Sequence, residues 1–339
     1  MPMKRYAVLA ITLAAMSVTL LDLAGAQEGA SFAGKTVTIY VGYGPGGGYD
    51  LYARVLSRHL GRHLPGNPAV VVSNMPGAGS IRAANYVYSV APKDGTALGI
   101  VAQSIAEEQL LGTSGVNYDV TKFAWIGRFA ANVEAAYVWH QAPIRTIEDL
   151  KTTEATFAGT GPTSVLYPRL LNSIAGMKWK VVQGYNTTAV AHLAMQRREV
   201  DGATSSLNTL KTTQQDWLDG KLIHLIVLFS VKRSGEFPNV PAVVEFGNTQ
   251  DEKDLLRFYA NSGTVGRAVI APPAMAADRI ALLRKAFDDT VKDPDFRTDI
   301  ATTKLEFEPM AGADLQSIVE ASTKVSDSVI ARAKAARTQ

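Results

Sequence analysis

The segment Tyr43-Gly44-Pro45-Gly46-Gly47-Gly48-Tyr49-Asp50 decides the fold, because the hydrophobic pattern changes across it. Residues 37–43 form a short apolar and β-branched run, which predicts a strand. Residues 50–64 carry apolar side chains at helical spacing. Glycines permit positive φ angles and close backbone approach, so the segment predicts a tight turn from a strand into a helix.

The same alternation continues outward from this segment. Residues 70–73 and 98–101 predict further strands, and residues 80–90 predict the helix between them. Such a βαβαβ run predicts a parallel sheet covered by helices, with right-handed crossovers. The alternation restarts after Trp125. There we expect strands at residues 135–139, 156–158, 181–183, 202–205, 222–229 and 268–271, and helices at residues 164–174, 187–197, 207–217, 274–292 and 315–333.

One stretch of the second half departs from this alternation. Residues 235–261 are rich in proline, glycine and charge, including Asp251-Glu252-Lys253-Asp254. Charge runs of this kind usually form a solvated surface, and we expect one here.

The N-terminus has the layout of a secretory signal peptide. Lys4 and Arg5 form a basic head, a mostly apolar run follows over residues 6–21, and Ala24-Gly25-Ala26 supplies small residues. We expect residues 1–26 to be removed by cleavage after Ala26. A retained membrane anchor is the alternative, but the apolar run is short for a membrane span.

Composition excludes several classes of function. The 339 residues are 47% hydrophobic and 19% charged, which is typical of a globular protein. The net charge is only +3 and no dense basic stripe occurs, so a nucleic-acid partner is not expected. The chain has no cysteine, which excludes disulfides, a lipid-modified N-terminal cysteine, a thiolate zinc site and a cysteine nucleophile.

Three glycine-rich segments predict an anion-binding site. The segment at residues 43–50 opens a helix, whose first N–H groups lack partners and carry the positive end of the dipole. Residues 74–80 repeat this arrangement after the second strand, and both loops then lie at the carboxyl edge of a parallel sheet. Residues 159–164 resemble them and add hydroxyl donors. Because this segment lies in the second half of the chain, we expect it on the opposite wall of a cleft. The alternative is that each segment is a tight turn without a ligand, since such motifs are individually weak.

Nucleotide-binding motifs do not fit these loops. The third glycine of a dinucleotide fingerprint should fall three residues after the second, and no acidic residue occurs between Asp50 and Asp94 to hold a ribose. No lysine follows the loop as in a P-loop. We therefore expect no cofactor.

Catalytic and metal-binding patterns are also missing from the sequence. Only His59 and His63 have the i, i+4 spacing of a metal pair, and no acidic residue stands between them. No Gly-x-Ser-x-Gly or Ser-x-x-Lys motif occurs. We expect neither a metal site nor an active site.

The chain resembles the substrate-binding receptors of tripartite tricarboxylate transporters, also called the Bug or TctC-like family. The resemblance covers nearly all of the chain after the signal peptide. It rests first on residues 44–50 followed by residues 70–80, which read Val-Val-Val-Ser-Asn-Met-Pro-Gly-Ala-Gly-Ser. Weaker similarities are Ala91-Pro92-Lys93-Asp94-Gly95-Thr96, Gly184-Tyr185, Arg198-Glu199-Val200-Asp201-Gly202, Pro238-Asn239-Val240-Pro241 and Ala271-Pro272-Pro273.

The resemblance implies a two-domain periplasmic binding fold of the type II-like class. Each domain would be a mainly parallel α/β sheet flanked by helices, with two chain crossovers near residues 126–132 and 260–267. Domain 1 would comprise residues 33–128 plus 264–339, and domain 2 residues 129–263.

The resemblance also implies a set of ligand-binding residues. In the first domain these are Tyr43, Gly44, Pro45, Gly46, Gly47, Gly48, Tyr49, Asp50, Pro76, Gly77, Ala78, Gly79 and Ser80. In the second domain they are Thr160, Gly161, Thr163, Ser164, Tyr185, Asn186, Ser205 and Ser206. Tyr49 replaces a usual Thr, Asn186 a frequent Lys, and Ser205-Ser206 a common acidic residue. These differences predict that carboxylate recognition depends mostly on neutral donors.

The implied function is that of a monomeric receptor in the periplasm, without a lipid anchor. It would capture a small organic carboxylate between its domains and deliver it to the membrane permease of a tripartite tricarboxylate transporter. A ligand-sensing partner of a periplasmic signalling domain is one alternative, because both roles use the same closure. An enzyme acting on a small anion is another, but the candidate loops contain Asp50 as their only titratable carboxylate.

Overall fold

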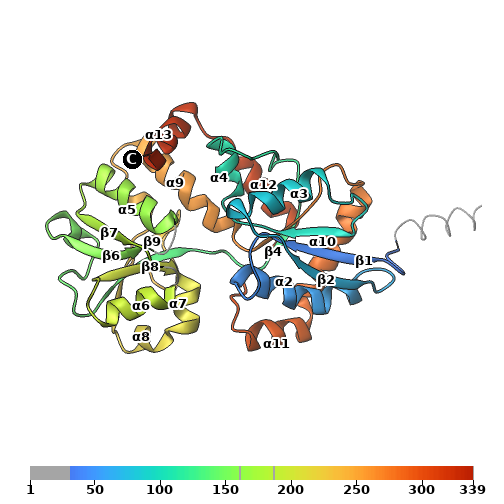
Figure 1. Ribbon diagram of the computed structural model, residues 1–339, viewed down its shortest axis with the longest axis horizontal. Helices are drawn as coiled ribbons and strands as arrows, with labels where there is room; N and C mark the ends of the chain where they lie inside the picture. The colour runs from blue at the N-terminus through green and yellow to red at the C-terminus, as the bar shows by residue number, and fades with distance from the viewer. Residues whose placement is uncertain (1–30, 160–161, 186–187, 339) are drawn as a thin grey trace, which may run out of the picture.

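The computed structural model describes residues 31–159, 162–185 and 188–338, and these form two α/β lobes (Figure 1). The first sheet has the order β11-β4-β10-β3-β1-β2 and the second the order β7-β6-β8-β5-β9. The first-sheet strands are β1 Thr36–Val41, β2 Ala69–Asn74, β3 Ala97–Ile100, β4 Ala124–Arg128, β10 Ala268–Ala271 and β11 Met310–Ala311. The second-sheet strands are β5 Glu134–Trp139, β6 Ala155–Gly159, β7 Trp179–Gln183, β8 Gly202–Ser206 and β9 Ile223–Phe229.

Strand direction brings three loops of the first sheet together. Strand β1 pairs in parallel with both β2 and β3, and Val41 is in register with Asn74 on one side and Ile100 on the other. The three strands therefore end at one edge. Strand β10 runs antiparallel to β3 and β4, and β11 runs antiparallel to β4, so the sheet is mixed.

The second sheet presents a similar edge. Strand β6 is parallel to β7 and β8, while β5 runs antiparallel to β8 and β9. The carboxyl ends of β6 and β8 and the first residue of β5, Glu134, consequently lie at one edge of this sheet.

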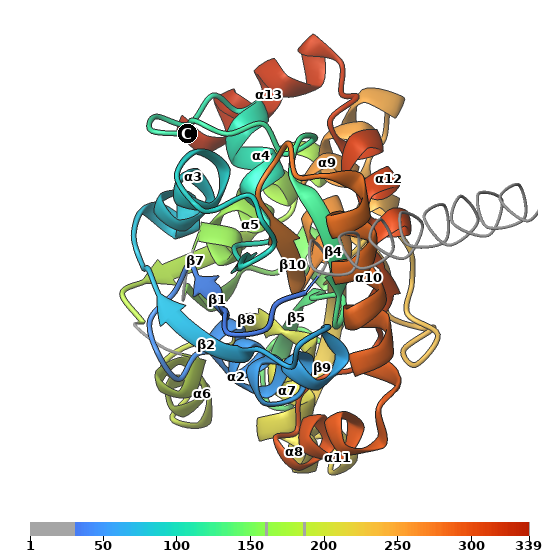
Figure 2. The same ribbon diagram turned by 90° about the vertical axis from the view of Figure 1, so that its right-hand side faces the viewer.

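Helices cover both faces of each sheet. Figure 2 shows α3 and α2 on opposite sides of strands β1 and β2. In the first lobe α2, α10 and α11 share one core, and α3, α4 and α12 share another. The first-lobe helices are α2 Gly48–His59, η1 Leu60–His63, η2 Ala78–Ser80, α3 Ile81–Ser89, α4 Ile105–Leu110, α10 Ala277–Lys292, α11 Pro294–Thr302 and α12 Gly312–Ser322.

The second lobe follows the same principle. Helices α5, α9 and α13 share the core on one face of its sheet, and α6, α7 and α8 share the core on the other. These helices are η3 Glu148–Lys151, α5 Pro162–Ala175, α6 Thr188–Gln196, α7 Leu207–Thr213, α8 Gln215–Asp219, η4 Val243–Phe246, α9 Gln250–Val265 and α13 Asp327–Thr338.

Three chain segments cross between the lobes: residues 323–326 join α12 to α13, and the other two lie side by side. Residues 129–133 lead from β4 into β5, and residues 266–267 lead from α9 into β10. The Phe129 N–H donates to the Arg267 carbonyl at 3.0 Å, and the Arg267 N–H donates to the Ala130 carbonyl at 2.9 Å. The Asn132 N–H adds a bond to the Gly263 carbonyl at 2.8 Å. The backbone of Arg267 is therefore fixed against the other connection.

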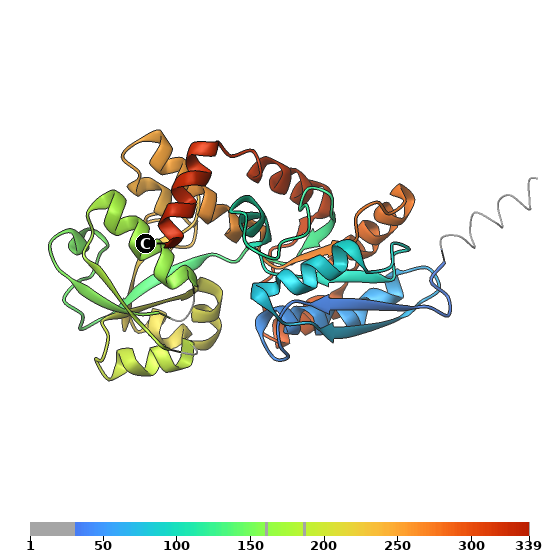
Figure 3. The same cartoon turned by 45° about the horizontal axis from the view of Figure 1, so that its top comes forward.

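The C-terminal segment differs from its sequence prediction. Residues 315–333 do not form one helix, because α12 ends at Ser322 and α13 begins at Asp327. Val329 and Ala333 of α13 pack into the core of the second lobe beside α9 (Figure 3). The apolar stripe that the sequence suggests is thus shared between two lobes. The domain division at residues 128/129 and 263/264 stays a prediction.

The expectation of a solvated surface over residues 235–261 is wrong for its second half. Helix α9 occupies Gln250–Val265 and buries Leu255, Leu256 and Tyr259. Its start is capped by Thr249, whose hydroxyl accepts from the Glu252 N–H, while the Glu252 carboxylate accepts from the Thr249 N–H. The charges of the segment lie on the exposed side of this helix.

No helix in the described part of the chain is long and apolar enough to cross a membrane. The predicted signal peptide, residues 1–26, lies outside the described residues.

Candidate functional site

The three βα loops of the first sheet are fastened together by Ser80. Its buried hydroxyl accepts a hydrogen bond from the Ala102 N–H at 3.0 Å, in the loop that follows β3. A side chain on Gly42 would collide with Ser80, so the first and second loops also pack directly against each other. The Ser80 side chain therefore points into the first lobe and holds the loops in place, and its role as a ligand contact stays a prediction.

The second loop has a strained backbone. Four consecutive residues take positive φ angles, namely Gly77 at 142°, Ala78 at 47°, Gly79 at 61° and Ser80 at 82°. Ala78 and Ser80 carry a Cβ in this region, which costs on the order of 1–3 kcal/mol at each residue. Residues 76–79 are exposed, so the strain presents this backbone at the surface of the edge.

Asp50 is a structural residue of the first loop. Its buried carboxylate accepts from the Gly46 N–H at 2.8 Å, from Arg54 Nε at 2.7 Å and from Asn74 Nδ2 at 2.9 Å. Burial opposes ionisation, but these three hydrogen bonds outweigh it and hold the pKa of Asp50 below its usual range. Asp50 therefore ties the glycine-rich loop to the end of β2 and occupies the N–H of Gly46.

The remaining N–H groups of this loop are available to a ligand. Gly48, Tyr49 and Asp50 form the first turn of α2, and within the described residues no acceptor bonds to their N–H groups. Such groups carry the positive end of the helix dipole and bind anions. Residues 44–48 are exposed, so this positive end faces outward.

Two tyrosines of the first loop form a stack that ends on Arg267. The rings of Tyr43 and Tyr49 are 4.6 Å apart with an interplanar angle of 21°. The Arg267 Cζ lies 4.0 Å from the centroid of the Tyr49 ring. The Tyr49 hydroxyl accepts from the Gln103 N–H at 3.1 Å, which joins the first loop to the third. Tyr49 thus positions Arg267 and Gln103.

Asn132 links the third loop, the second lobe and Arg267 through its side chain. Its Nδ2 donates to Gln103 Oε1 at 2.8 Å, and its Oδ1 accepts from Arg267 Nη2 at 3.1 Å and from Ser206 Oγ at 2.9 Å. Asn132 is buried and lies in the connection between β4 and β5. We call the group Tyr49, Gln103, Asn132, Ser206 and Arg267 the junction.

Five of the eight second-lobe candidates lie within the described residues. The Ser205 hydroxyl lies 3.0 Å from the Tyr137 hydroxyl in the buried interior, and the Ser206 hydroxyl bonds to Asn132. Ser164 is buried and Tyr185 packs against the core formed with α6 to α8. Thr163 belongs to the first turn of α5. Thr160, Gly161 and Asn186 lie outside the described residues.

Glu134 places a titratable carboxyl at the same edge. It is the first residue of β5 and lies two residues from Asn132. Burial raises the pKa of its partly exposed carboxyl to about 7, while the charge of Arg267 and a hydrogen bond from Asn132 lower it. Glu134 therefore changes charge near neutral pH.

Sequence analysis missed Gln103, Asn132, Glu134 and Arg267. Gln103 could have been found, because the third parallel strand must end at the same edge as the first two. Asn132 and Arg267 lie in or beside the predicted crossovers, where polar residues are natural candidates for a site. The expectation that recognition depends mostly on neutral donors stays a prediction.

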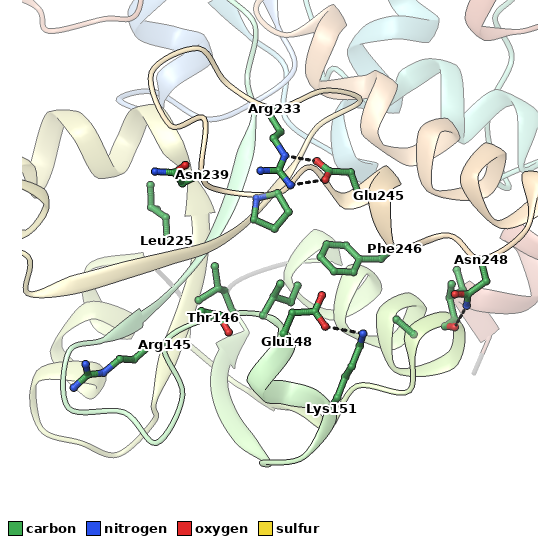
Figure 4. Close-up of a pocket in the computed structure, with 15 residues that line it drawn as sticks. Arg145, Thr146, Glu148, Lys151, Leu225, Arg233, Asn239, Glu245, Phe246 and Asn248 are labelled. Carbon is green, nitrogen blue, oxygen red and sulfur yellow. Dashed lines mark hydrogen bonds and ion pairs between the residues drawn. The ribbon is translucent and has the colours of Figure 1, made fainter.

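A cavity lies elsewhere, in the second lobe. Its volume is about 610 Å³ and it opens beside η3, β9 and η4 of the second lobe (Figure 4). Most of its charges pair with one another: Arg233 binds Glu245 at 2.6 Å and Lys151 binds Glu148 at 2.6 Å. The net charge that this cavity offers is therefore small.

The histidine pair of the sequence has a structural role. His59 Nε2 lies 2.8 Å from Asp299, and His63 Nε2 lies 2.9 Å from Asp293, so both fasten α2 and η1 to α11. Among the described residues, no group of three or more His, Cys, Asp or Glu could hold a metal ion.

Comparison with known proteins agrees with this architecture. The tripartite tricarboxylate transporter family receptor model matches residues 52–334. A UPF0065 protein of Cupriavidus necator is 26% identical over 304 residues, covering 88% of this chain and 87% of the relative. Among solved structures, a TctC solute-binding protein from Polaromonas has a TM-score of 0.66 at 17% identity, covering 90% of this chain and 99% of that one.

Two similar structures from Rhodopseudomonas palustris contain ligands. MatC with bound malate has a TM-score of 0.59 at 19% identity, with 89% of this chain and 98% of that chain covered. A second protein, with adipate, has a TM-score of 0.60 at 21% identity, with 89% and 96% covered. These likenesses establish the binding-receptor fold, and the match over residues 52–334 establishes the family. The chain belongs to the tripartite tricarboxylate transporter receptor family.

Proposed function

We propose that this protein is a periplasmic receptor that captures a small organic carboxylate at the junction and delivers it to the permease of a tripartite tricarboxylate transporter. The observation that carries the proposal is the convergence of three loops of the first sheet beside the open N-terminus of α2. Malate and adipate in structures of similar fold support a carboxylate as the ligand class.

Binding at this position needs no covalent chemistry. One carboxylate oxygen accepts from the first-turn N–H groups of Gly48 and Tyr49, and the second lobe then moves over the ligand about the segments that join the lobes. The ligand favours the closed form only through the additional contacts made there. Hydrogen bonds to a charged oxygen contribute roughly 1.5–3 kcal/mol each, so three or four of them, less the cost of association, reach about micromolar affinity.

Thermal unfolding in the presence of organic acids tests the proposal. The panel is L-malate, adipate, citrate and benzoate at millimolar concentration, with glucose as a neutral control. At least one acid is expected to raise the Tm in a concentration-dependent manner, because a ligand that binds only the native state stabilises it. Failure of all four acids would refute carboxylate capture. Cell fractionation of the full-length chain, followed by mass determination, tests periplasmic location and cleavage after Ala26.

A further inference from the structure

Arg267 is the cation of the junction, and its side chain is held in place from several sides. It precedes β10 directly, and its own backbone is bonded to Phe129 and Ala130 of the other connection. The guanidinium stacks on Tyr49 and donates to Asn132. A half-buried arginine with both ends restrained has lost much of its conformational freedom before any ligand arrives, which favours binding.

The guanidinium lies beside the N-terminus of α2. A Cβ built on Gly48 would lie 3.7 Å from Arg267 Nη2, so the cation is in van der Waals range of the first turn of α2. The N–H groups of that turn and the guanidinium therefore surround one region of space. Both attract negative charge, and together they match the two oxygens of a carboxylate.

The Arg267 guanidinium forms no ion pair within the described residues, although its charge lowers the pKa of the Glu134 carboxyl at the same edge. By contrast, Arg54, Arg58 and Arg233 each have a carboxylate oxygen within 4.0 Å. A guanidinium carries five N–H donors, and the hydrogen bond to Asn132 uses one of them. Within the described residues no other acceptor bonds to this guanidinium, which leaves donors for an incoming oxygen.

We infer that Arg267 binds a carboxylate group of the ligand directly and supplies the formal charge of the site. This inference rests on the proposed receptor function and deepens it, because recognition then depends on a full positive charge as well as on neutral backbone donors. The charged guanidinium selects ionised acids over their amides and esters. The bound carboxylate then lies between α2 and residues 266–267.

Arg267→Gln is the first test, run with the same four acids by thermal unfolding and by calorimetry at pH 7.5. Loss of a charge-assisted hydrogen bond is expected to weaken the tightest acid about 10- to 100-fold. Arg267→Lys, which keeps the charge but not the planar fork, is expected to give an intermediate loss. Arg145→Gln is the matched control, since Arg145 lines the 610 Å³ cavity and should leave affinity unchanged.

A change in the ligand distinguishes direct contact from a structural effect. Each acid of the panel is compared with its primary amide. Wild type should lose affinity on this change, while Arg267→Gln should discriminate much less between acid and amide. If Arg267→Gln does not fold, as judged by circular dichroism, the same comparison is made with Arg267→Lys, which should discriminate less than wild type.

Each outcome has a defined meaning. Equal binding of the acids by wild type and Arg267→Gln would overturn the role of Arg267 and leave the receptor function intact. Equal acid-over-amide preference in wild type and variant would do the same. If Arg145→Gln weakens binding instead, the site lies in the other cavity and the inference is wrong. Absence of binding to wild type would overturn the receptor function and this inference with it.

Discussion

Replacement of Asp50 by alanine is expected to damage the first loop more than any other single change at the site. The carboxylate is 1% exposed and holds Gly46, Arg54 and Asn74 at distances of 2.7 to 2.9 Å. In Asp50→Ala the Gly46 N–H and one N–H of Asn74 lose their charged acceptor. Asn74 then keeps only its bond to the Tyr43 carbonyl, at 3.0 Å.

The expected loss in the free energy of unfolding follows from the two hydrogen bonds to the neutral donors Gly46 and Asn74. A hydrogen bond to a charged group contributes roughly 1.5–3 kcal/mol, and the exposed loop lets water replace part of it. We therefore expect Asp50→Ala to lower the free energy of unfolding by about 3 kcal/mol, which corresponds to a Tm decrease of roughly 6–12 °C. The bond to Arg54 adds little, because that arginine is about half exposed.

Urea and thermal unfolding followed by circular dichroism measure this loss. Arg54→Gln is the control, since it removes only the exposed ion pair and should unfold like wild type. The low pKa of Asp50 means that its stabilisation is present above the ordinary carboxyl range and is lost as pH falls through the folded pKa. The difference between wild type and Asp50→Asn should be constant from pH 5 to 8 and shrink below about pH 4. Equal stability of Asp50→Ala and Arg54→Gln would refute the structural role.

Two further predictions concern the strands that lead into the junction. Gly127→Ala should destabilise the first lobe by about 1–3 kcal/mol in urea unfolding, because the added methyl collides with the buried Phe287 ring, whereas Gly235→Ala, which meets no atom within 4 Å, should be neutral. Glu134 has a raised pKa of about 7, so it favours the native state fully below its ordinary pKa and opposes it as pH rises toward 7. Wild type should therefore lose up to about 3 kcal/mol between pH 5 and 8 that Glu134→Gln retains, and identical pH profiles would contradict the assignment.

The strands and the glycine-rich loops were predictable because their signals are local. Residues 268–271 form β10 as predicted, and the predicted strand at residues 70–73 lies within β2. An apolar or β-branched run bounded by glycine and proline encodes a buried strand without reference to the rest of the chain. The parallel order of the first three strands then follows from the helices between them.

The sequence of helix α9 carries two conflicting local signals. The charges of Asp251 to Asp254 suggest a solvated surface, yet Thr249 and Glu252 form a capping box and Leu255, Leu256 and Tyr259 follow at helical spacing. The break between α12 and α13 has no comparable local signal. Val325 and Val329 suit either lobe as apolar residues, and only packing of the whole chain assigns them to the second.

The donors that remain available at the binding edge depend on which hydrogen bonds are made inside the protein. A sequence motif does not show these bonds. Asp50, Ser80, Ser205 and Ser206 have the right chemistry and the right places, but each bonds to another part of the chain. These residues build the edge, and their role as ligand contacts stays a prediction. Arg267 is the opposite case, since it follows no glycine-rich motif and is brought beside α2 only because the two connections are bonded to each other. Charge at this edge is therefore a product of how the lobes are joined.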